Sequence, residues 1–248
     1  MRLGIITDLH ANREASEAVF AHAETQGVER IAFLGDFVGY GADPGWVVDE
    51  VRKRVADNNA FALRGNHDAA VVDGPAPTMR PEPRQAVAWS REHLNTEQLA
   101  FLAGLPLRIV DGDRLYVHAN AFAPAEWGYI VSRIDAARSM QATPCRMTFC
   151  GHVHEPMLYH HSGTGKTGDF APTPGVPIPL SSHRQWLAIP GSVGQPRDGN
   201  PAACYAMFDT VEKALTFHRV PYDVETAAAK IRRAGLPPFF ADRLRDGK

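Results

Sequence analysis

The sequence has few cysteines and no set of them that could form a disulfide framework. Cys145, Cys150 and Cys204 are the only three among 248 residues. An odd, sparse set is typical of proteins from reducing compartments, so we expect a cytoplasmic location. Cys145 and Cys150 also lack the Cys-x-x-Cys spacing of zinc or redox sites. We therefore interpret the three cysteines as small buried side chains.

Long apolar stretches are absent as well. No run reaches the roughly 20 apolar residues that span a bilayer, so we expect no membrane contact. Residues 1–8 contain no long apolar segment before a small-residue cleavage site, so they do not resemble a signal peptide. This short apolar start predicts a first buried strand.

The chain also lacks an excess of basic charge. Its formal net charge is -2, which argues against general nucleic-acid or membrane-surface binding. A small phosphate ester remains a suitable partner, because local metal ions can override the global charge. The 44% hydrophobic and 22% charged residues are ordinary for a globular protein. No break in composition divides the chain, so we expect one domain over residues 1–248.

Strand-like and helix-like segments alternate in the first part of the chain. This alternation favours an α/β fold with a largely parallel sheet covered by helices. Beyond residue 155, short strands separated by glycine and proline turns predict an antiparallel portion packed on that sheet. The expected strands are 3–7, 30–34, 60–63, 107–110, 115–118, 147–150, 157–161, 185–189, 204–209 and 214–219, and the first two helices are 12–26 and 44–56.

Two segments are predicted to lie outside this framework. An insertion at about 69–104, with a proline-rich loop at 71–83 and a helix at 84–103, is expected to cap a cleft. A helical tail at about 222–248 begins with an amphipathic helix at 222–234. We expect the tail to pack on the body, although a monomer and a homodimer both remain open. Residues 162–184 are rich in Gly, Pro, Ser and Thr and predict a long surface loop.

Polar clusters follow the predicted strands at their carboxyl ends. In open α/β sheets the loops at this edge converge on ligands, even when they are far apart in sequence. The candidate ligands carry oxygen or imidazole donors and no thiolate, which suits Mn, Fe, Zn or similar ions. They are Asp8, His10, Asp36, Asn66, His118, His152 and His154.

Seven ligands exceed the needs of one tetrahedral ion and suit two ions that share a carboxylate. Two such cations with two aspartates and a hydroxide would keep about one positive charge, which attracts a phosphate. They would also supply hydroxide near neutral pH for attack on phosphorus. Each motif alone has a plainer interpretation as a turn, a helix cap or a surface histidine pair. Only their ordered combination predicts a metal centre.

This ordered set resembles the calcineurin-like metallophosphoesterases over about residues 7–209. The segment 190–198 is similar to a turn in the bacterial branch related to small phosphodiesterases and diadenosine tetraphosphate hydrolases. The resemblance implies a four-layer αββα sandwich of two mixed β-sheets flanked by helices. Three residues depart from the family pattern: Ala11, Ala119 and Ile189. Ile189 stands where the family often has an asparagine, so a substrate contact from that asparagine is not expected here.

The resemblance also implies a role for each site residue. Asp8, His10 and His154 would hold one metal ion, and Asn66, His118 and His152 the other, with Asp36 bridging them. His67 would protonate the leaving-group oxygen and Asp68 would orient His67. Arg64 would clamp phosphate, for which a planar guanidinium is well suited. Asn66 and His67 would also contact substrate.

Three aromatic residues are further candidates. Tyr40, near Asp36 in sequence, is expected to line the cleft and contact substrate. Trp127 and Tyr129 could stack on a nucleobase, but packing is the commoner role of such residues.

The sequence therefore predicts a dinuclear metal-dependent phosphoesterase that hydrolyses phosphomonoesters or phosphodiesters. Nucleotides such as diadenosine polyphosphates are candidate substrates. The alternative is a catalytically silent protein-interaction scaffold of the same fold, similar to the retromer subunit. The presence of every ligand and of His67 favours the enzyme.

Overall fold

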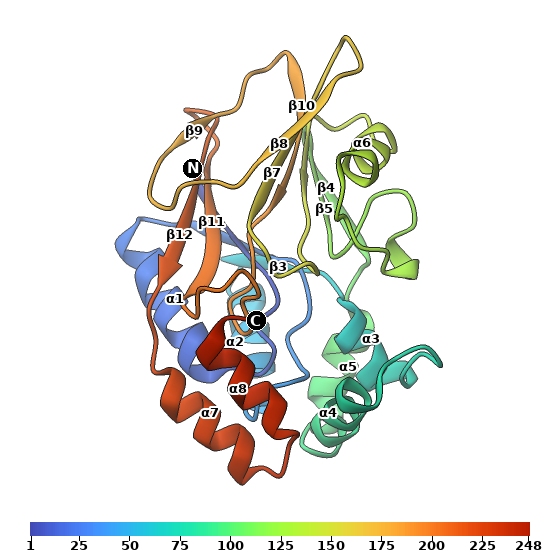
Figure 1. Ribbon diagram of the computed structural model, residues 1–248, viewed down its shortest axis with the longest axis vertical. Helices are drawn as coiled ribbons and strands as arrows, with labels where there is room; N and C mark the ends of the chain where they lie inside the picture. Colours follow the sequence, from blue (N-terminus) through green and yellow to red (C-terminus); the bar gives the residue numbers. More distant parts are fainter.

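The computed structural model describes residues 1–248 and contains two six-stranded mixed sheets (Figure 1). In the first sheet, β1 runs parallel to β2 and β2 runs parallel to β3, whereas β1 and β11 are antiparallel. Its order is β3 (Ala60–Ala62), β2 (Arg30–Phe33), β1 (Arg2–Ile6), β11 (Ala203–Asp209), β12 (Ala214–Val220) and β9 (Ile178–Pro179).

The second sheet has the same mixed character. Strand β6 runs parallel to both β5 and β10, and the outer strands pair antiparallel. Its order is β4 (Arg108–Asp111), β5 (Arg114–Val117), β6 (Met147–Phe149), β10 (Arg184–Ile189), β7 (Met157–Ser162) and β8 (Thr167–Phe170). Parallel strands end at the same edge of a sheet, so β1, β2 and β3 bring their following loops together, as do β5 and β6.

Three hydrophobic clusters separate the four layers. The middle cluster, which includes Leu3, Tyr116 and Phe208, fills the space between the sheets. Helices α1 (Arg13–Thr25) and α2 (Pro44–Ala56) cover the first sheet with Val19 and Val48. Helix α6 (Arg133–Gln141) covers the second. The expected αββα sandwich of two mixed sheets is confirmed.

The insertion after β3 differs in detail from the sequence-based expectation. It contains α3 (Asn66–Asp73), α4 (Pro81–Glu92) and α5 (Thr96–Gly104). The predicted single helix at 84–103 is wrong, because Asn95 caps α5 and exchanges hydrogen bonds with Gln98. The predicted loop at 71–83 overlaps the end of α3 and the start of α4.

The predicted long loop at 162–184 is also wrong in part. It contains β8, which pairs with β7, and the short β9, which pairs with β12. Polar residues and glycine make up most of β8, so it lacks the apolar alternation that predicts a strand.

Helix α6 was not predicted; Ser132 caps it by accepting a hydrogen bond from the Asp135 backbone. A short 3₁₀ helix, η1, spans Pro124–Glu126.

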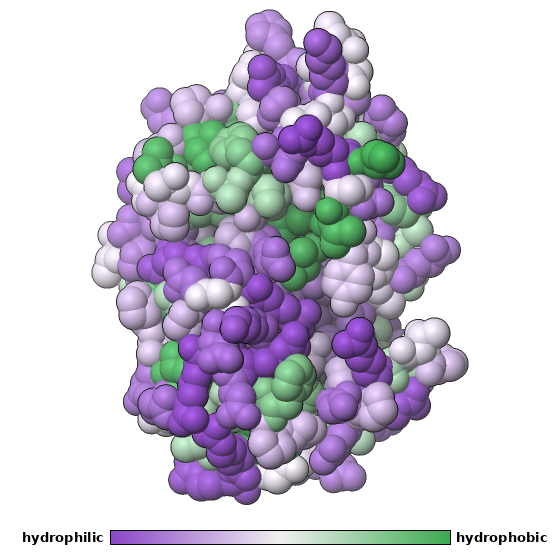
Figure 2. Space-filling model, in the orientation of Figure 1, coloured by the Kyte–Doolittle hydropathy of each residue, from purple (hydrophilic) through white to green (hydrophobic).

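The C-terminal tail forms α7 (Val224–Arg233) and α8 (Pro238–Asp246), which pack on the body as expected. Ala227, Ile231 and Phe240 belong to a buried cluster that includes Tyr40. Figure 2 shows that the surface over these helices, in the lower half of the view, is mainly hydrophilic. None of the helices combines the length and apolar character needed to cross a bilayer. The single-domain organisation over residues 1–248 stays a prediction.

Candidate metal centre

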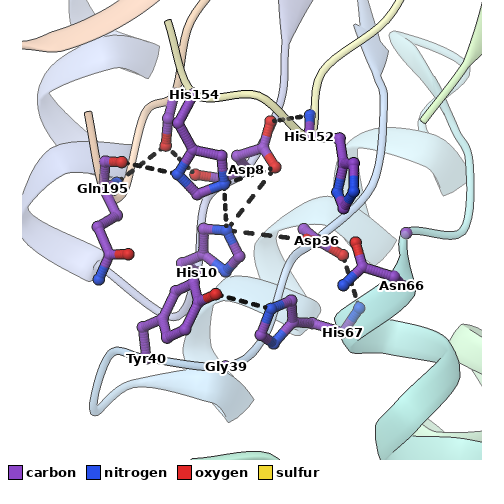
Figure 3. A network of polar contacts seen from close by, with 12 residues as sticks. Asp8, His10, Asp36, Gly39, Tyr40, Asn66, His67, His152, His154 and Gln195 are labelled. Carbon is purple, nitrogen blue, oxygen red and sulfur yellow. Dashed lines mark hydrogen bonds and ion pairs between the residues drawn. The ribbon is translucent and has the colours of Figure 1, made fainter. Parts of the chain in front are cut away.

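The loops after five strands converge on one buried site (Figure 3). The structure brings all seven candidate ligands together, and six of them are buried: Asp8, His10, Asp36, His118, His152 and His154. Asn66 is partly exposed and begins α3. The seven come from the loops after β1, β2, β3, β5 and β6.

The first ligand cluster consists of Asp8, His10 and His154. Asp8 Oδ1 lies 3.2 Å from His154 Nε2 and 3.7 Å from His10 Nε2. The two imidazole Nε2 atoms are 3.0 Å apart. Ligand bonds of about 2.0–2.2 Å place neighbouring ligand atoms about 3.0–3.6 Å apart, so these separations suit a shared cation.

The second cluster consists of Asp36, His118 and His152, with Asn66 beside it. His118 Nε2 lies 3.4 Å from Asp36 Oδ2 and 3.0 Å from Asn66 Oδ1. Asp36 Oδ2 is also 3.8 Å from His10 Nε2 in the first cluster. The Asp36 carboxylate therefore lies between the two groups of ligands.

Backbone carbonyls fix the tautomers of three histidines. The Nδ1 atoms of His10, His118 and His154 contact the carbonyl oxygens of Val38, Leu34 and Gln195 at 3.1, 2.9 and 2.7 Å. A carbonyl only accepts, so each Nδ1 carries a proton and each Nε2 is the ring atom that faces the site, where it can ligate once it is deprotonated. This arrangement is typical of metal-ligating histidines.

The donor set fits cation binding. In the His10–His154 contact two lone pairs face each other at 3.0 Å, an arrangement that a proton or a cation between them would stabilise. Asp8 Oδ1 and His152 Nε2 are buried and have no hydrogen-bond partner. Buried polar atoms are normally satisfied, so these two unpartnered atoms are available to ligate a cation.

The protonation states suit ligation as well. Burial alone would raise the pKa of Asp8, but His154 and His10 hold that pKa well below its usual value. Burial lowers the pKa of His152 to about 3 and that of His154 to about 4. Burial opposes protonation of His118, yet Asp36 raises its pKa to about 9. A cation binding there would displace the His118 proton.

Backbone strain is concentrated at the site. Five of the ten non-glycine residues with positive φ are candidate ligands: Asp8, His10, Asp36, His152 and His154. The left-handed conformation costs about 1–2 kcal/mol for such residues, and its clustering is typical of functional sites.

The turn at 190–198 supports the first cluster from behind. Ser192 Oγ donates to the Asp8 carbonyl at 2.9 Å, and the Gly194 N–H donates to the same oxygen at 2.8 Å. The His154 ring donates to the carbonyl of Gln195 in this turn. The turn thus fixes the positions of Asp8 and His154.

His67 lies beside the ligands at the start of α3. Its backbone N–H donates to Asp36 Oδ1 at 2.8 Å, and its Nε2 lies 3.0 Å from the Tyr40 hydroxyl. Its Nδ1 is buried without a partner and packs against Gly39, where an added Cβ would lie 2.4 Å away. Burial lowers the pKa of His67 to about 3.

The Asp68 carboxylate forms no hydrogen bond with the His67 ring, which the expected orienting role would require. Its carboxylate accepts backbone N–H groups from Asp36, Phe37 and Gly65 at 2.8, 2.9 and 2.9 Å. These three donors engage both carboxylate oxygens and occupy three of their roughly four acceptor positions. Asp68 therefore ties the loop after β2 to the loop after β3. Burial, reinforced by the nearby Asp36, raises its pKa to about 6.

The Arg64 guanidinium is already engaged in an ion pair. It pairs with Asp73 at 2.7 Å, and Arg64 is not among the residues that line the cleft. Arg197, which the sequence analysis did not single out, does line it and donates to the Tyr40 hydroxyl at 3.3 Å. The only sequence signal for Arg197 was its place in the turn at 190–198.

A cleft of about 870 Å³ opens beside the second cluster. Tyr40, Asn66, His67 and His152 lie on its inner wall, and residues 69–83 form another side. Trp127 and Tyr129, the other two aromatic candidates, line it as well. The Tyr129 ring stacks on His152 with centroids 4.0 Å apart, so it covers a candidate ligand.

Comparisons with known proteins agree with this geometry. The family model described as the calcineurin-like phosphoesterase superfamily domain matches residues 1–213. An uncharacterised protein of Methanocaldococcus jannaschii, MJ0912, is 32% identical over 98% of this chain and 96% of its own length.

Two solved structures are similar over the whole chain. A metallophosphoesterase from Sphaerobacter thermophilus has 37% identity and a TM-score of 0.86, with 100% of both chains covered. The hypothetical protein PH1004 from Pyrococcus horikoshii has 17% identity and a TM-score of 0.79, covering 100% of this chain and 98% of that one. At this lower identity the likeness concerns the fold alone.

Proposed function

Because this chain belongs to the calcineurin-like phosphoesterase superfamily, we propose that it is a dinuclear metal-dependent hydrolase of phosphomonoesters or phosphodiesters. The observation that carries the proposal is the position of Asp36. One of its oxygens lies 3.4 Å from His118 and 3.8 Å from His10, which belong to different ligand clusters. A carboxylate in that position is suited to two ions rather than one.

In this proposal Asp8, His10 and His154 would hold one ion, Asn66, His118 and His152 would hold the other, and Asp36 would be shared between them. Nitrogen and oxygen donors without thiolate favour Mn, Fe, Zn or similar ions. When bound, two such cations supply hydroxide at neutral pH and stabilise charge on the transferred phosphoryl group.

His67 donates a proton to the leaving-group oxygen in this proposal. Burial and the neighbouring histidines lower its pKa in the protein alone. A bound phosphate dianion places negative charge beside the ring and raises that pKa, which favours the protonated form. Asp68 is a positioning residue, because it fixes the loops that carry Asp36 and Asn66.

The substrate is a small phosphate ester, and nucleotides such as diadenosine polyphosphates are candidates. A cleft of about 870 Å³ lies in the upper part of the usual ligand-pocket range of about 300–1,000 Å³. It therefore accommodates more than the phosphate group itself. Trp127 and Tyr129 on its wall provide ring faces for a base.

A metal analysis combined with a phosphoester panel tests the proposal. We expect about two ions per chain and hydrolysis of p-nitrophenyl phosphate or bis(p-nitrophenyl) phosphate in the presence of Mn²⁺. Asp36→Asn should lower the metal content, because the bridging charge is lost; an unchanged stoichiometry by elemental analysis contradicts the bridging role. Protein without bound metal and without activity on any ester would instead indicate a silent scaffold.

A further inference from the structure

One wall of the cleft is basic, and the proposed function does not use it. Arg80, Arg197 and Arg243 line the cleft, and none of them forms an ion pair with a carboxylate. The acidic side chains on the cleft wall do not offset these charges directly. Asp73 is paired with Arg64, and Glu82 and Glu126 are exposed to solvent.

Helix α8 brings Arg243 to this wall. Phe240 is buried and packs on the Tyr40 ring with centroids 4.8 Å apart. Arg243 follows three residues later, on the same side of the helix, and its guanidinium lies 4.7 Å from the Phe239 ring. Burial lowers the pKa of Arg243, and the positive charges of Arg197 and Arg80 lower it further. The guanidinium groups are thus close enough to repel one another.

Arg197 connects the basic wall to the candidate proton donor. Its Nη2 donates to the Tyr40 hydroxyl at 3.3 Å, and that hydroxyl lies 3.0 Å from His67 Nε2. Its Nε is buried and has no partner. Only the Tyr40 hydroxyl therefore lies between the Arg197 guanidinium and His67. Arg243 on α8 continues the basic wall along the cleft.

We propose that Arg197 and Arg243 form a subsite for a second phosphate group, carried by the leaving group of the substrate. This inference rests on the proposed function, in which His67 protonates the leaving-group oxygen. The bond between phosphorus and that oxygen breaks, water supplies the new oxygen on phosphorus, and the proton goes to the departing phosphorylated group. Guanidinium groups suit this role because they bind phosphate oxygens in pairs.

Part of the subsite lies outside the segment that the family model matches. The family match ends at residue 213, whereas Arg243 lies in α8, beyond it. The leaving groups that fit are phosphorylated nucleosides or similar phosphorylated alcohols. The second phosphate can be linked directly to the first, as in a phosphoanhydride, or through a sugar.

Matched substrates that differ by one phosphate on the leaving group test the subsite. AMP is a monoester with adenosine as leaving group, and ADP is a phosphoanhydride with AMP as leaving group. Adenylyl-(3′→5′)-adenosine, a diester, and diadenosine 5′,5′-diphosphate, a phosphoanhydride, form the equivalent pair for substrates with a nucleoside on each side. We expect kcat/KM to favour the second member of whichever pair is hydrolysed. Adenosine 3′,5′-bisphosphate distinguishes a sugar-linked phosphate from a directly linked one.

Arg243→Gln should lower this preference by about 10- to 100-fold, the usual effect of losing a charged hydrogen bond. Arg245→Gln is the matched control, because Arg245 lies on the same helix but pairs with Glu225; it should keep the wild-type preference. Equal use of both members of each pair, or equal effects of the two variants, overturns the subsite. If the wild-type protein with Mn²⁺ hydrolyses none of these substrates and no p-nitrophenyl phosphate, the proposed function is overturned instead.

Discussion

The Asp68 carboxylate accepts the backbone N–H of Asp36 at 2.8 Å. This bond joins the residue that lies between the two ligand clusters to the first turn of α3. The same carboxylate accepts the N–H groups of Phe37 and Gly65. Asp68 thus holds together two loops that approach from different strands, and the spacing of the ligands depends on it.

Asp68→Asn should therefore weaken both folding and metal binding. An amide group presents one acceptor oxygen and one NH₂ group to three backbone donors, so at least one buried N–H loses its partner. We expect a loss of about 2–3 kcal/mol in the free energy of unfolding, measured by urea titration, together with weaker Mn²⁺ binding. Asp73→Asn, an exposed position on the same helix, should cost less than about 1 kcal/mol. Wild-type stability and metal affinity combined with poor turnover would mean that Asp68 acts on His67 after all.

His67→Ala should separate catalysis from metal binding. The His67 ring is not part of the two ligand sets assigned above, so elemental analysis should find the wild-type metal content. The value of kcat should fall by about 10²–10⁴-fold, the usual contribution of a general acid. His93→Ala is the control, because His93 is exposed and its ring contacts only α4. Normal turnover in His67→Ala would reject the assignment.

Removal of metal should destabilise the protein. Without a cation, the lone pairs of His10 and His154 face each other at 3.0 Å. The strained backbone of the candidate ligands with positive φ is then not offset by metal–ligand bonds. Free metal at 100 times its Kd should add about 2.7 kcal/mol per site to the free energy of unfolding. Differential scanning calorimetry with EDTA and then with excess Mn²⁺ measures this difference. A melting temperature unaffected by either addition would speak against resident cations.

Gly39→Ala should disturb His67 without touching a ligand. An added Cβ would lie 2.4 Å from His67 Nδ1, and the φ of +85° is unfavourable for alanine. We expect at least a 10-fold lower kcat with retained metal, because a small displacement of a catalytic group is costly. Gly112→Ala is the control, because its φ of +61° gives similar backbone strain but nothing lies within 4 Å of the added Cβ. It therefore separates the effect of backbone strain from that of the clash with His67. Equal activity in both variants would show that the position of the His67 ring is not critical.

The sequence could predict that the seven candidate ligands come together, because each of them follows a strand whose apolar pattern is clear. The bounds of α2 were predictable for a similar reason, since Pro44 marks its first turn. The partner of Arg64 was not predictable, because an ion pair with Asp73 depends on side-chain directions at the start and end of α3. Arg197 was missed because its approach to Tyr40 depends on how the turn at 190–198 packs against the loop after β2.

A buried histidine outside the site should make stability depend on pH. His218 on β12 stacks on Tyr205, and His22 on α1 lies beside both rings. Burial and the proximity of His22 lower the pKa of His218 to about 4 from its usual 6.5. Between these two pH values the unfolded chain takes up a proton that the folded chain refuses.

The contribution of His218 is therefore fully present above about pH 6.5 and is lost as the pH falls toward 4. The maximum slope is about 1.4 kcal/mol per pH unit, and we expect about 1 kcal/mol between pH 7 and pH 5 because the side chain keeps some contact with solvent. Urea unfolding of the wild type and of His218→Gln at both pH values measures it. The variant keeps all site histidines, so only the His218 contribution differs between the two proteins. An identical pH dependence in both would show that His218 takes up its proton equally in the folded and unfolded states.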